Sequence, residues 1–271
     1  MRALIAVDLE GITGIVTEAD TARQGAPAAR ARGYMRADLD AVLEGCAAAG
    51  VREVVVCDAH DDGRNLTAAD LPDVVTLNSG SSAPLSMLEG LTTDCAAALF
   101  VGYHARAGTE AAVLEHTWNY KVFSVRVGDL EVGELGIGAL FAGELGVPAV
   151  YVSGDDKTAA EAEALVPGIT TTIVKRGIAR ESAALFAPEV VMTRLRDDVK
   201  TALTAPGWPA PLAWTGEPLR LTFTRVGFCD LAAACPGTRR LDGRTLEISG
   251  GSFAEIYAVF LACLRLSELP A

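Results

Sequence analysis

Short apolar runs alternate with alanine-rich stretches of helical character through the first 155 residues of this chain. Parallel strands that are covered on both faces read as continuous apolar runs, and they need a helix or a comparable crossover between them. The pattern therefore predicts an α/β fold in which a mainly parallel sheet has helices on both faces. The expected strands are Leu4 to Val7, Glu53 to Cys57, Ala97 to Val101 and Ala149 to Val152.

One helical face is clear between the first two expected strands. Its apolar residues recur at helical spacing: Met35, Leu39, Val42, Leu43 and Cys46. Gly50 follows where a helix commonly ends. This segment therefore predicts a βαβ unit with a long loop before its helix.

The rest of the chain has a different character. Between Lys121 and Leu130, apolar residues lie near a Gly-Asp pair, which indicates an antiparallel hairpin. Beyond Asp155 we expect, in order, an Ala/Glu-rich helix, a strand near Thr170 to Val174, a helix near Ala184 to Leu203, a proline-rich break at Pro206 to Pro211, strands at Leu219 to Arg225 and Thr245 to Ile248, and a helix from Phe253 to Leu266. We interpret residues 1–271 as a single catalytic unit, in which an α/β metal-site portion (1–155) shares its core with a C-terminal α+β portion (156–271).

Composition excludes several classes of partner. A formal net charge of -12 argues against nucleic acid, because phosphate backbones require a basic face. The N-terminus reaches Asp8 too early for the apolar core of a signal peptide, and no later stretch approaches the ~18 apolar residues of a membrane span. The six cysteines stand singly among apolar neighbours, as buried thiols do in a reducing compartment. We therefore expect a cytoplasmic protein without a nucleic-acid or membrane partner.

Two of the three histidines follow expected parallel strands directly, in Cys57-Asp58-Ala59-His60 and Gly102-Tyr103-His104. Open α/β sheets place their ligand crevice at such strand ends. Asp8 and Glu10 end the first strand two residues apart, so in extended backbone their side chains project from one face. Carboxylate and imidazole ligands together suit zinc or a similar divalent ion. The residues alone thus predict a metal site at this edge.

Each candidate residue also has a purely structural interpretation. A strand-end Asp often orders a loop, and Glu134, between glycines at the start of an apolar helix, complements the helix dipole. For His116 three roles are open: a metal ligand, a proton-transfer group or a surface histidine. Arg106 is placed either to pair a substrate carboxylate or to form an ordinary salt bridge. The chain has no Gly-x-Gly-x-x-Gly, Walker or Gly-x-Ser-x-Gly motif, which removes support for nucleotide binding and for the simplest serine hydrolase.

Five ordered motifs stand out along the chain. They are Val7-Asp8-Leu9-Glu10-Gly11-Ile12-Thr13-Gly14, Asp58-Ala59-His60, Ser86-Met87-Leu88-Glu89-Gly90, Gly102-Tyr103-His104-Ala105-Arg106-Ala107 and Val132-Gly133-Glu134-Leu135-Gly136. Together they resemble the zinc-dependent D-aminopeptidase family, the DppA-like metallopeptidases first associated with a dipeptide-permease operon. The resemblance runs nearly the whole chain, through Ser153-Gly154-Asp155-Asp156 to Cys235-Pro236-Gly237-Thr238.

The resemblance carries specific implications for the site. It implies that two zinc ions per subunit are held by Asp8, Glu10, His60, His104 and Glu134, with Asp8 as a bridging carboxylate. It implies that His116 is the catalytic residue, although the segment between His104 and His116 is longer here than in the family pattern. It further implies that metal-activated hydroxide cleaves the N-terminal amide bond of short peptides that begin with a D-residue such as D-alanine. The resemblance also implies that the subunits assemble into a ring-shaped homo-oligomer that encloses the active sites.

Three other functions remain open on the sequence. The same site is suited to L-peptides or small amides, because stereochemistry depends on pocket shape. A dinuclear-metal phosphoesterase is the second alternative, but the chain lacks the Asp-x-His and Gly-Asn-His patterns of such enzymes and has few cations to hold phosphate. The third alternative is a peptide-binding module without catalysis. The presence of all five proposed ligands and of His116 argues against it.

Overall fold

The computed structural model describes residues 1–69, 71–80 and 82–269, and a seven-stranded sheet dominates the molecule. Its strand order is β3-β2-β1-β4-β7-β8-β9, with parallel neighbours throughout this described part except the antiparallel pair of β8 and β9. The strands are β1 (Arg2–Val7), β2 (Glu53–Asp58), β3 (Val75–Asn78), β4 (Ala97–Val101), β7 (Ala149–Asp155), β8 (Thr170–Ala179) and β9 (Ser182–Leu185). The four strands expected first, near residues 4, 53, 97 and 149, are confirmed.

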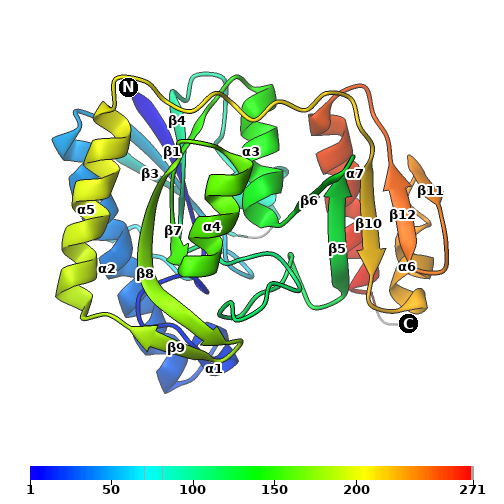
Figure 1. Cartoon of the computed structure of the whole chain (residues 1–271), viewed down its shortest axis with the longest axis horizontal. Helices are drawn as coiled ribbons and strands as arrows, with labels where there is room; N and C mark the ends of the chain where they lie inside the picture. Colours follow the sequence, from blue (N-terminus) through cyan, green and yellow to red (C-terminus); the bar gives the residue numbers. More distant parts are fainter. Residues whose placement is uncertain (70, 81, 270–271) are drawn as a thin grey trace.

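Helices cover both faces of this sheet, as Figure 1 shows. Ile5 of β1 belongs to the apolar cluster formed with α2 and α5, whereas its neighbour Leu4 belongs to the cluster formed with α3 and α4. These helices are α2 (Ala26–Ala48), α3 (Glu134–Glu144), α4 (Asp156–Leu165) and α5 (Pro188–Thr204). Because successive residues of a strand face opposite sides, a continuous apolar run serves both layers. The α/β class with a mainly parallel, doubly covered sheet is confirmed.

A second, antiparallel sheet lies on the other side of α3 (Figure 1), in the order β11-β12-β10-β5-β6. Its strands are β5 (Val122–Val127), β6 (Leu130–Val132), β10 (Leu219–Phe223), β11 (Thr238–Arg240) and β12 (Thr245–Ile248). The turn between β5 and β6 uses Gly128 at φ 59°, which confirms the expected hairpin at the Gly-Asp pair. The middle of the chain thus builds part of the C-terminal sheet.

The last long helix joins the two sheets. Helix α7 (Phe253–Ser267) begins after Ser252, whose hydroxyl accepts a hydrogen bond from the amide of Glu255. Phe260 of this helix shares one apolar cluster with Phe100 of the parallel sheet and Leu221 of the antiparallel sheet. The remaining helical elements are α1 (Glu18–Thr21), α6 (Val226–Ala232) and the 3-10 turn η1 (Ser86–Leu88).

Some boundaries differ from the expectation. Neither β3 nor β9 was expected, because both are edge strands with partly exposed residues instead of a buried apolar run. The helix expected at Ala184 to Leu203 starts only at Pro188, because the residues before it pair with the end of β8. The strand expected at Thr170 to Val174 continues to Ala179, past the fully buried Lys175.

Two expectations from composition can be compared with the described residues. All six cysteines of the chain lie within them as buried free thiols, as predicted. The described residues also contain no helix with both the length and the apolar character that crossing a membrane requires.

Two glycines of α2 provide a test of helix packing. Gly45→Ala is expected to lower the free energy of unfolding by about 1–3 kcal/mol, because overpacking strains a close contact. The added Cβ would lie 2.6 Å from the carbonyl oxygen of Arg196 and 2.9 Å from Cβ of Val199. Gly33→Ala is the control, since its Cβ would meet no described atom within 4 Å. It should stabilise by about 0.5–1 kcal/mol through helix propensity. Urea denaturation measures the free energy of unfolding of both variants. Equal changes in this free energy would contradict the close packing of α2 on α5.

Candidate metal centre

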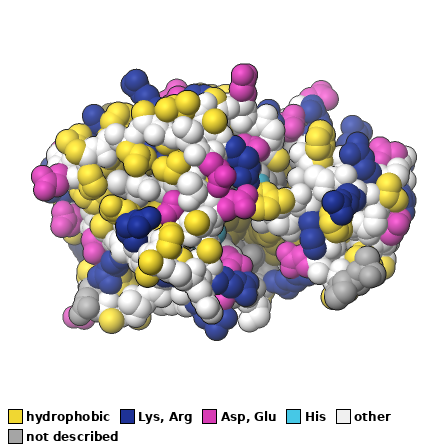
Figure 2. Space-filling view, turned by 90° about the horizontal axis from the view of Figure 1, so that it is seen from below, with side chains coloured by type: hydrophobic (Ala, Val, Ile, Leu, Met, Phe, Trp, Pro, Cys, Tyr) yellow, Lys and Arg dark blue, Asp and Glu magenta, His cyan; other side chains and the backbone are white. Residues whose placement is uncertain are grey.

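A cavity of about 420 Å³ opens beside the carboxyl ends of β1 and β2, and Figure 2 shows the surface hollowed between the two parts of the molecule. Five of the six residues singled out from the sequence line it: Asp8, Glu10, His60, His116 and Glu134. The sixth, His104, lies directly behind, with its ring stacked on that of His116 at 4.0 Å between centroids. The structure therefore brings together side chains from positions 8 to 134 of the chain.

Two glycines allow the loops after β1 and β4 to meet. A Cβ on Gly11 would lie 1.9 Å from the carbonyl oxygen of Tyr103. Gly102 has φ +69°, and a Cβ there would lie 2.4 Å from the carbonyl oxygen of Asp8. Only glycine fits such an approach, and Gly102 also needs a backbone conformation that side chains disfavour. These contacts place Asp8 and His104 next to each other.

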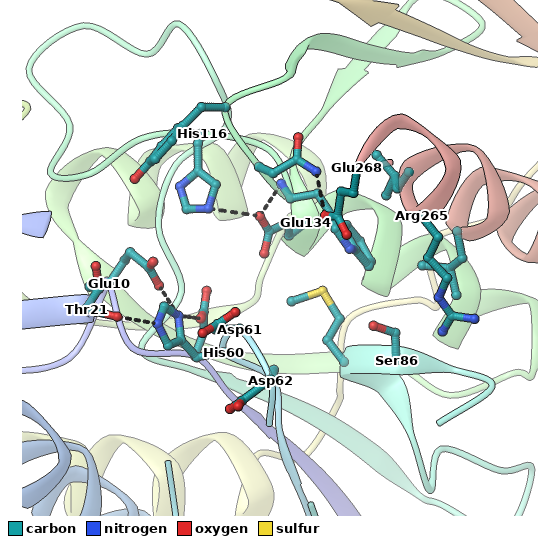
Figure 3. Close-up of a pocket in the computed structure, with 18 of the residues that line it drawn as sticks. Glu10, Thr21, His60, Asp61, Asp62, Ser86, His116, Glu134, Arg265 and Glu268 are labelled. Atoms are coloured by element: carbon teal, nitrogen blue, oxygen red, sulfur yellow. Dashed lines mark hydrogen bonds and ion pairs between the residues drawn. The ribbon is translucent and has the colours of Figure 1, made fainter. Parts of the chain in front are cut away.

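The first group of polar side chains surrounds His60. Its Nδ1 lies 3.3 Å from Oδ1 of Asp8 and 3.0 Å from Oε2 of Glu10. The loop that carries His60 is ordered by Asp58, whose carboxylate accepts hydrogen bonds from the backbone amides of Asn65 and Leu66. Figure 3 shows His60 and Glu10 facing each other on one side of the cavity.

The second group surrounds His104. Its Nε2 lies 3.5 Å from Oδ2 of Asp8 and 3.4 Å from Oε1 of Glu134, which stands at the first position of α3. The same Glu134 oxygen accepts a 2.5 Å hydrogen bond from the amide of Trp118 and lies 3.8 Å from Nε2 of His116. Asp8 therefore lies between the two histidines, with one carboxylate oxygen towards each.

Each imidazole is held by one backbone carbonyl. Because a carbonyl oxygen only accepts, the bonded ring nitrogen carries a proton, and in the neutral ring the lone pair lies on the other nitrogen. The bonds run from His60 Nε2 to Thr21 (3.1 Å), from His104 Nδ1 to Ala105 (3.0 Å) and from His116 Nδ1 to Leu114 (2.8 Å). Such bonds fix the tautomer and orientation of metal-binding histidines in proteins.

The three buried carboxylates differ in their electrostatic surroundings. Burial, followed by the neighbouring charge of Glu10, raises the pKa of Asp8 to about 7. Burial alone would also raise the pKa of Glu10, but the nearby His60 outweighs it and holds that pKa well below its usual value. The pKa of Glu134 is likewise lowered, because His104 and His116 outweigh the effect of burial.

The pKa values of the three imidazoles are also shifted. Burial would lower the pKa of His104, but Glu134 and Asp8 raise it to about 10. For His60, the charge of Glu10 and the contact with Asp8 overcome burial and raise the pKa well above its usual value. The pKa of His116 is lowered instead, first by burial and then by the charge of His104. Two of the three rings are therefore cationic at neutral pH, and His116 is neutral.

This arrangement fits a bound divalent cation. Asp8 Oδ2, Glu10 Oε2 and His104 Nε2 are buried and have no hydrogen-bond partner among the described residues. Ligand atoms of Asp8, Glu10 and His104 lie within 4.8 Å of one another, and so do those of His104, His116 and Glu134. Unpartnered buried carboxylate and imidazole atoms are costly unless a cation completes them. The donor set is the mixture of oxygen and nitrogen that zinc and similar ions accept.

The sequence argument was wrong or silent on some points. Asp8 and Glu10 follow β1 in a turn, so strand alternation is not the reason that they share a cavity. Arg106 is paired with Glu131 at 3.1 Å and is not among the lining residues, which favours the ordinary salt bridge. Further residues line the cavity: Thr21, Arg23, Ala59, Asp61, Asp62, Ser86, Met87, Trp118, Asn119, Tyr120, Leu261, Leu264, Arg265 and Glu268. Ala59, Ser86 and Met87 belong to the motifs of the sequence analysis, but no residue of this set was predicted to carry a role in the site.

Comparisons with known proteins show the family to which the chain belongs. The family model described as D-aminopeptidase (peptidase M55) matches residues 1–262. A curated D-aminopeptidase from Bacillus subtilis (strain 168) is 33% identical over 271 residues, which cover 98% of each chain. The solved structure of the Zn-dependent D-aminopeptidase DppA from Bacillus subtilis, described as a self-compartmentalizing protease, superposes with a TM-score of 0.96 at 32% identity over 100% of this chain and 99% of that one. The motif resemblance is thereby confirmed, and this chain belongs to the D-aminopeptidase family, peptidase M55.

Proposed function

We propose that this chain is a zinc-dependent aminopeptidase that hydrolyses the N-terminal amide bond of short peptides carrying a D-residue such as D-alanine at the N-terminus. Membership of the D-aminopeptidase family makes the chain a peptide-bond hydrolase. The relative of known structure is Zn-dependent, which supports zinc as the metal here. The observation that carries the proposal is the position of Asp8, whose two carboxylate oxygens face His60 and His104.

The geometry favours two ions per subunit. Asp8, Glu10 and His60 would hold one ion, and Asp8, His104 and Glu134 would hold the other, so that the two sets of residues share Asp8. Three carboxylates against two doubly charged ions would leave a net charge of about +1, which would favour an anion near the site. When bound, zinc supplies a Lewis acid that polarises a carbonyl and lowers the pKa of water.

His116 is the proposed catalytic residue. Its ring lies at the cavity wall with Nε2 3.8 Å from Oε1 of Glu134, and its lowered pKa keeps the ring neutral near pH 7. A neutral imidazole with a lone pair at Nε2 accepts a proton from the attacking water and returns it to the leaving amine. The bond from Nδ1 to Leu114 holds the ring in this orientation.

The cavity lining is suited to a free amino terminus. Outside the proposed metal ligands, its described lining residues include three carboxylates, Asp61, Asp62 and Glu268, and two arginines, Arg23 and Arg265. Arg23 is itself paired with Asp61 at 2.6 Å. The carboxylates of Asp62 and Glu268 are therefore the proposed acceptors for the terminal ammonium of a peptide. The limited cavity volume of about 420 Å³ restricts the substrate to short peptides.

The central test combines metal analysis with a substrate panel. Protein purified without chelator should hold about two zinc ions per subunit and should cleave D-Ala dipeptides faster than their L-counterparts. His104→Ala should lose zinc and activity together, since it removes a ligand. His116→Ala should keep its zinc while kcat falls by about 10²–10⁴-fold, the usual contribution of a general base. Elemental analysis and an amine-release assay measure these effects.

Glu163→Gln, an exposed substitution on α4, serves as the control and should leave both zinc content and kcat unchanged. Fewer than about one tightly held zinc ion per subunit, with no rescue by added zinc, would refute the proposed mechanism. Faster cleavage of the L-dipeptides would contradict the proposed preference for an N-terminal D-residue. Hydrolysis of a phosphate ester in place of any dipeptide would favour a phosphoesterase.

Zinc binding should release protons. At pH 7 the zinc-free protein keeps protons on His60 and His104, whose pKa values are raised, and zinc binds only the neutral rings. Protons should therefore leave at pH 8, and more of them should leave at pH 6 because the pKa of Asp8 is about 7. Calorimetric titration with zinc in buffers of different ionisation enthalpy counts them. A proton count near zero at both pH values would contradict the assigned ligands.

We also propose that the chain assembles into a ring-shaped homo-oligomer. The relative of known structure is described as self-compartmentalizing, which supports assembly of like subunits around enclosed sites. Size-exclusion chromatography with light scattering should give a mass several times that of one chain. A monomeric mass at micromolar concentration, with full peptidase activity, would exclude enclosure as a requirement.

A further inference from the structure

A lysine at the centre of the molecule makes three hydrogen bonds to one loop. Lys175 of β8 is 0% exposed, and its Nζ donates to the carbonyl oxygens of Glu10 (2.5 Å), Ile12 (2.9 Å) and Ile15 (2.8 Å). An ammonium group has three protons, so these bonds use all of them. The partners are 160 to 165 residues away in sequence, and the bonds therefore tie β8 to the segment that follows β1.

The tied segment is the ligand loop, residues 9–16, which has turns and bends but no regular secondary structure. Its backbone carbonyls cannot pair with a neighbouring strand, and a buried carbonyl without a partner costs free energy. Lys175 supplies the donors that regular structure would otherwise supply. One of the three carbonyls belongs to Glu10, whose carboxylate lies 3.0 Å from Nδ1 of His60 on the other side of the loop.

A second buried ion holds the same loop from α2. Asp38 is 0% exposed, and its Oδ2 accepts hydrogen bonds from the amide and the hydroxyl of Thr13 at 3.0 and 3.1 Å. Burial lowers the pKa of Lys175 to about 8, while the charges of Asp155 and Asp38 oppose that effect. Neither Lys175 nor Asp38 lines the cavity, so neither contacts a substrate there. Their contacts instead converge on the loop that carries Glu10.

We propose that Lys175 is a positioning residue of the metal centre, whose ammonium group fixes the backbone of the ligand loop so that the Glu10 carboxylate stays within ligand distance of the His60 ring. This inference rests on the proposed zinc site. Without the ammonium group, the carbonyls of Glu10 and Ile15 must turn towards other donors or water, whereas that of Ile12 keeps the amide of Ile15 at 3.2 Å. The backbone of Glu10 then moves with its carbonyl. Residues that orient ligands from behind commonly alter metal affinity by about 10–100-fold.

The experiment compares Lys175→Met with Val174→Ala. Methionine keeps most of the side-chain length and removes the donors, whereas Val174 is a buried neighbour on the same strand that belongs to the α2 and α5 apolar cluster. Both variants should lower the melting temperature of the zinc-free protein. Competition with a chromophoric chelator should show that the zinc dissociation constant of Lys175→Met rises by about 10-fold or more, and that of Val174→Ala by less than about 3-fold. Only Lys175→Met should show a clearly smaller zinc-induced rise in melting temperature than the unaltered protein.

Equal zinc affinities for Lys175→Met and the unaltered protein would overturn the proposal and leave a purely structural lysine. If Lys175→Met does not fold, Lys175→Gln replaces it, because a neutral amide still donates to one or two carbonyls and should give a smaller loss of affinity. If neither variant folds, the rate at which an acetylating reagent labels Lys175 in the unaltered protein tests the proposal. Coupling is reciprocal, so zinc should slow labelling of Lys175 relative to Lys200, and an unchanged ratio would overturn the proposal.

These readouts are independent of peptide hydrolysis. A protein that binds zinc through a Lys175-dependent loop but cleaves no D-dipeptide would refute the proposed function and keep the inference. A protein that cleaves D-dipeptides, but whose zinc affinity does not depend on Lys175, would support the proposed function and refute the inference.

Discussion

Burial of like charges is the constraint on which the rest of this structure depends. Asp8, Glu10 and Glu134 lie together with only 2 to 6% of their surface exposed, and ionised carboxylates buried to this degree are unstable without nearby positive charge. Imidazoles at 3.0 to 3.5 Å supply part of that charge and take up protons to do so. The buried atoms without a hydrogen-bond partner, Asp8 Oδ2, Glu10 Oε2 and His104 Nε2, are of the types that the proposed zinc site requires.

The fold meets this constraint by holding irregular backbone from several sides. Glycines let the loops after β1 and β4 touch, the hairpin of β5 and β6 delivers Glu134 at the start of α3, and Lys175 and Asp38 bind the ligand loop from behind. Each loop is thus fixed by groups outside the cavity. Side chains within the cavity are left available for the metal and the substrate.

The strand-end rule identified Asp8, His60 and His104 from the sequence, because the polar residues follow buried apolar runs directly. Glu134 has no comparable signal, since an acid in the first helical turn is equally expected from the helix dipole. The motif resemblance was needed to include it. Lys175 was missed because a charged residue in an apolar run is typical of the end of a strand. The cavity residues of α7, Leu261, Leu264 and Arg265, were missed because their place depends on contacts between distant segments.

The bond between His116 Nδ1 and the Leu114 carbonyl limits how this residue can work. One ring nitrogen is already committed, so any proton traffic must use the other in both directions. In the proposed mechanism, the water that reacts and the amine that departs would therefore approach the same edge of the ring, one after the other. The ring would not need to turn over between the two proton transfers, and it would be neutral again at the end of each cycle.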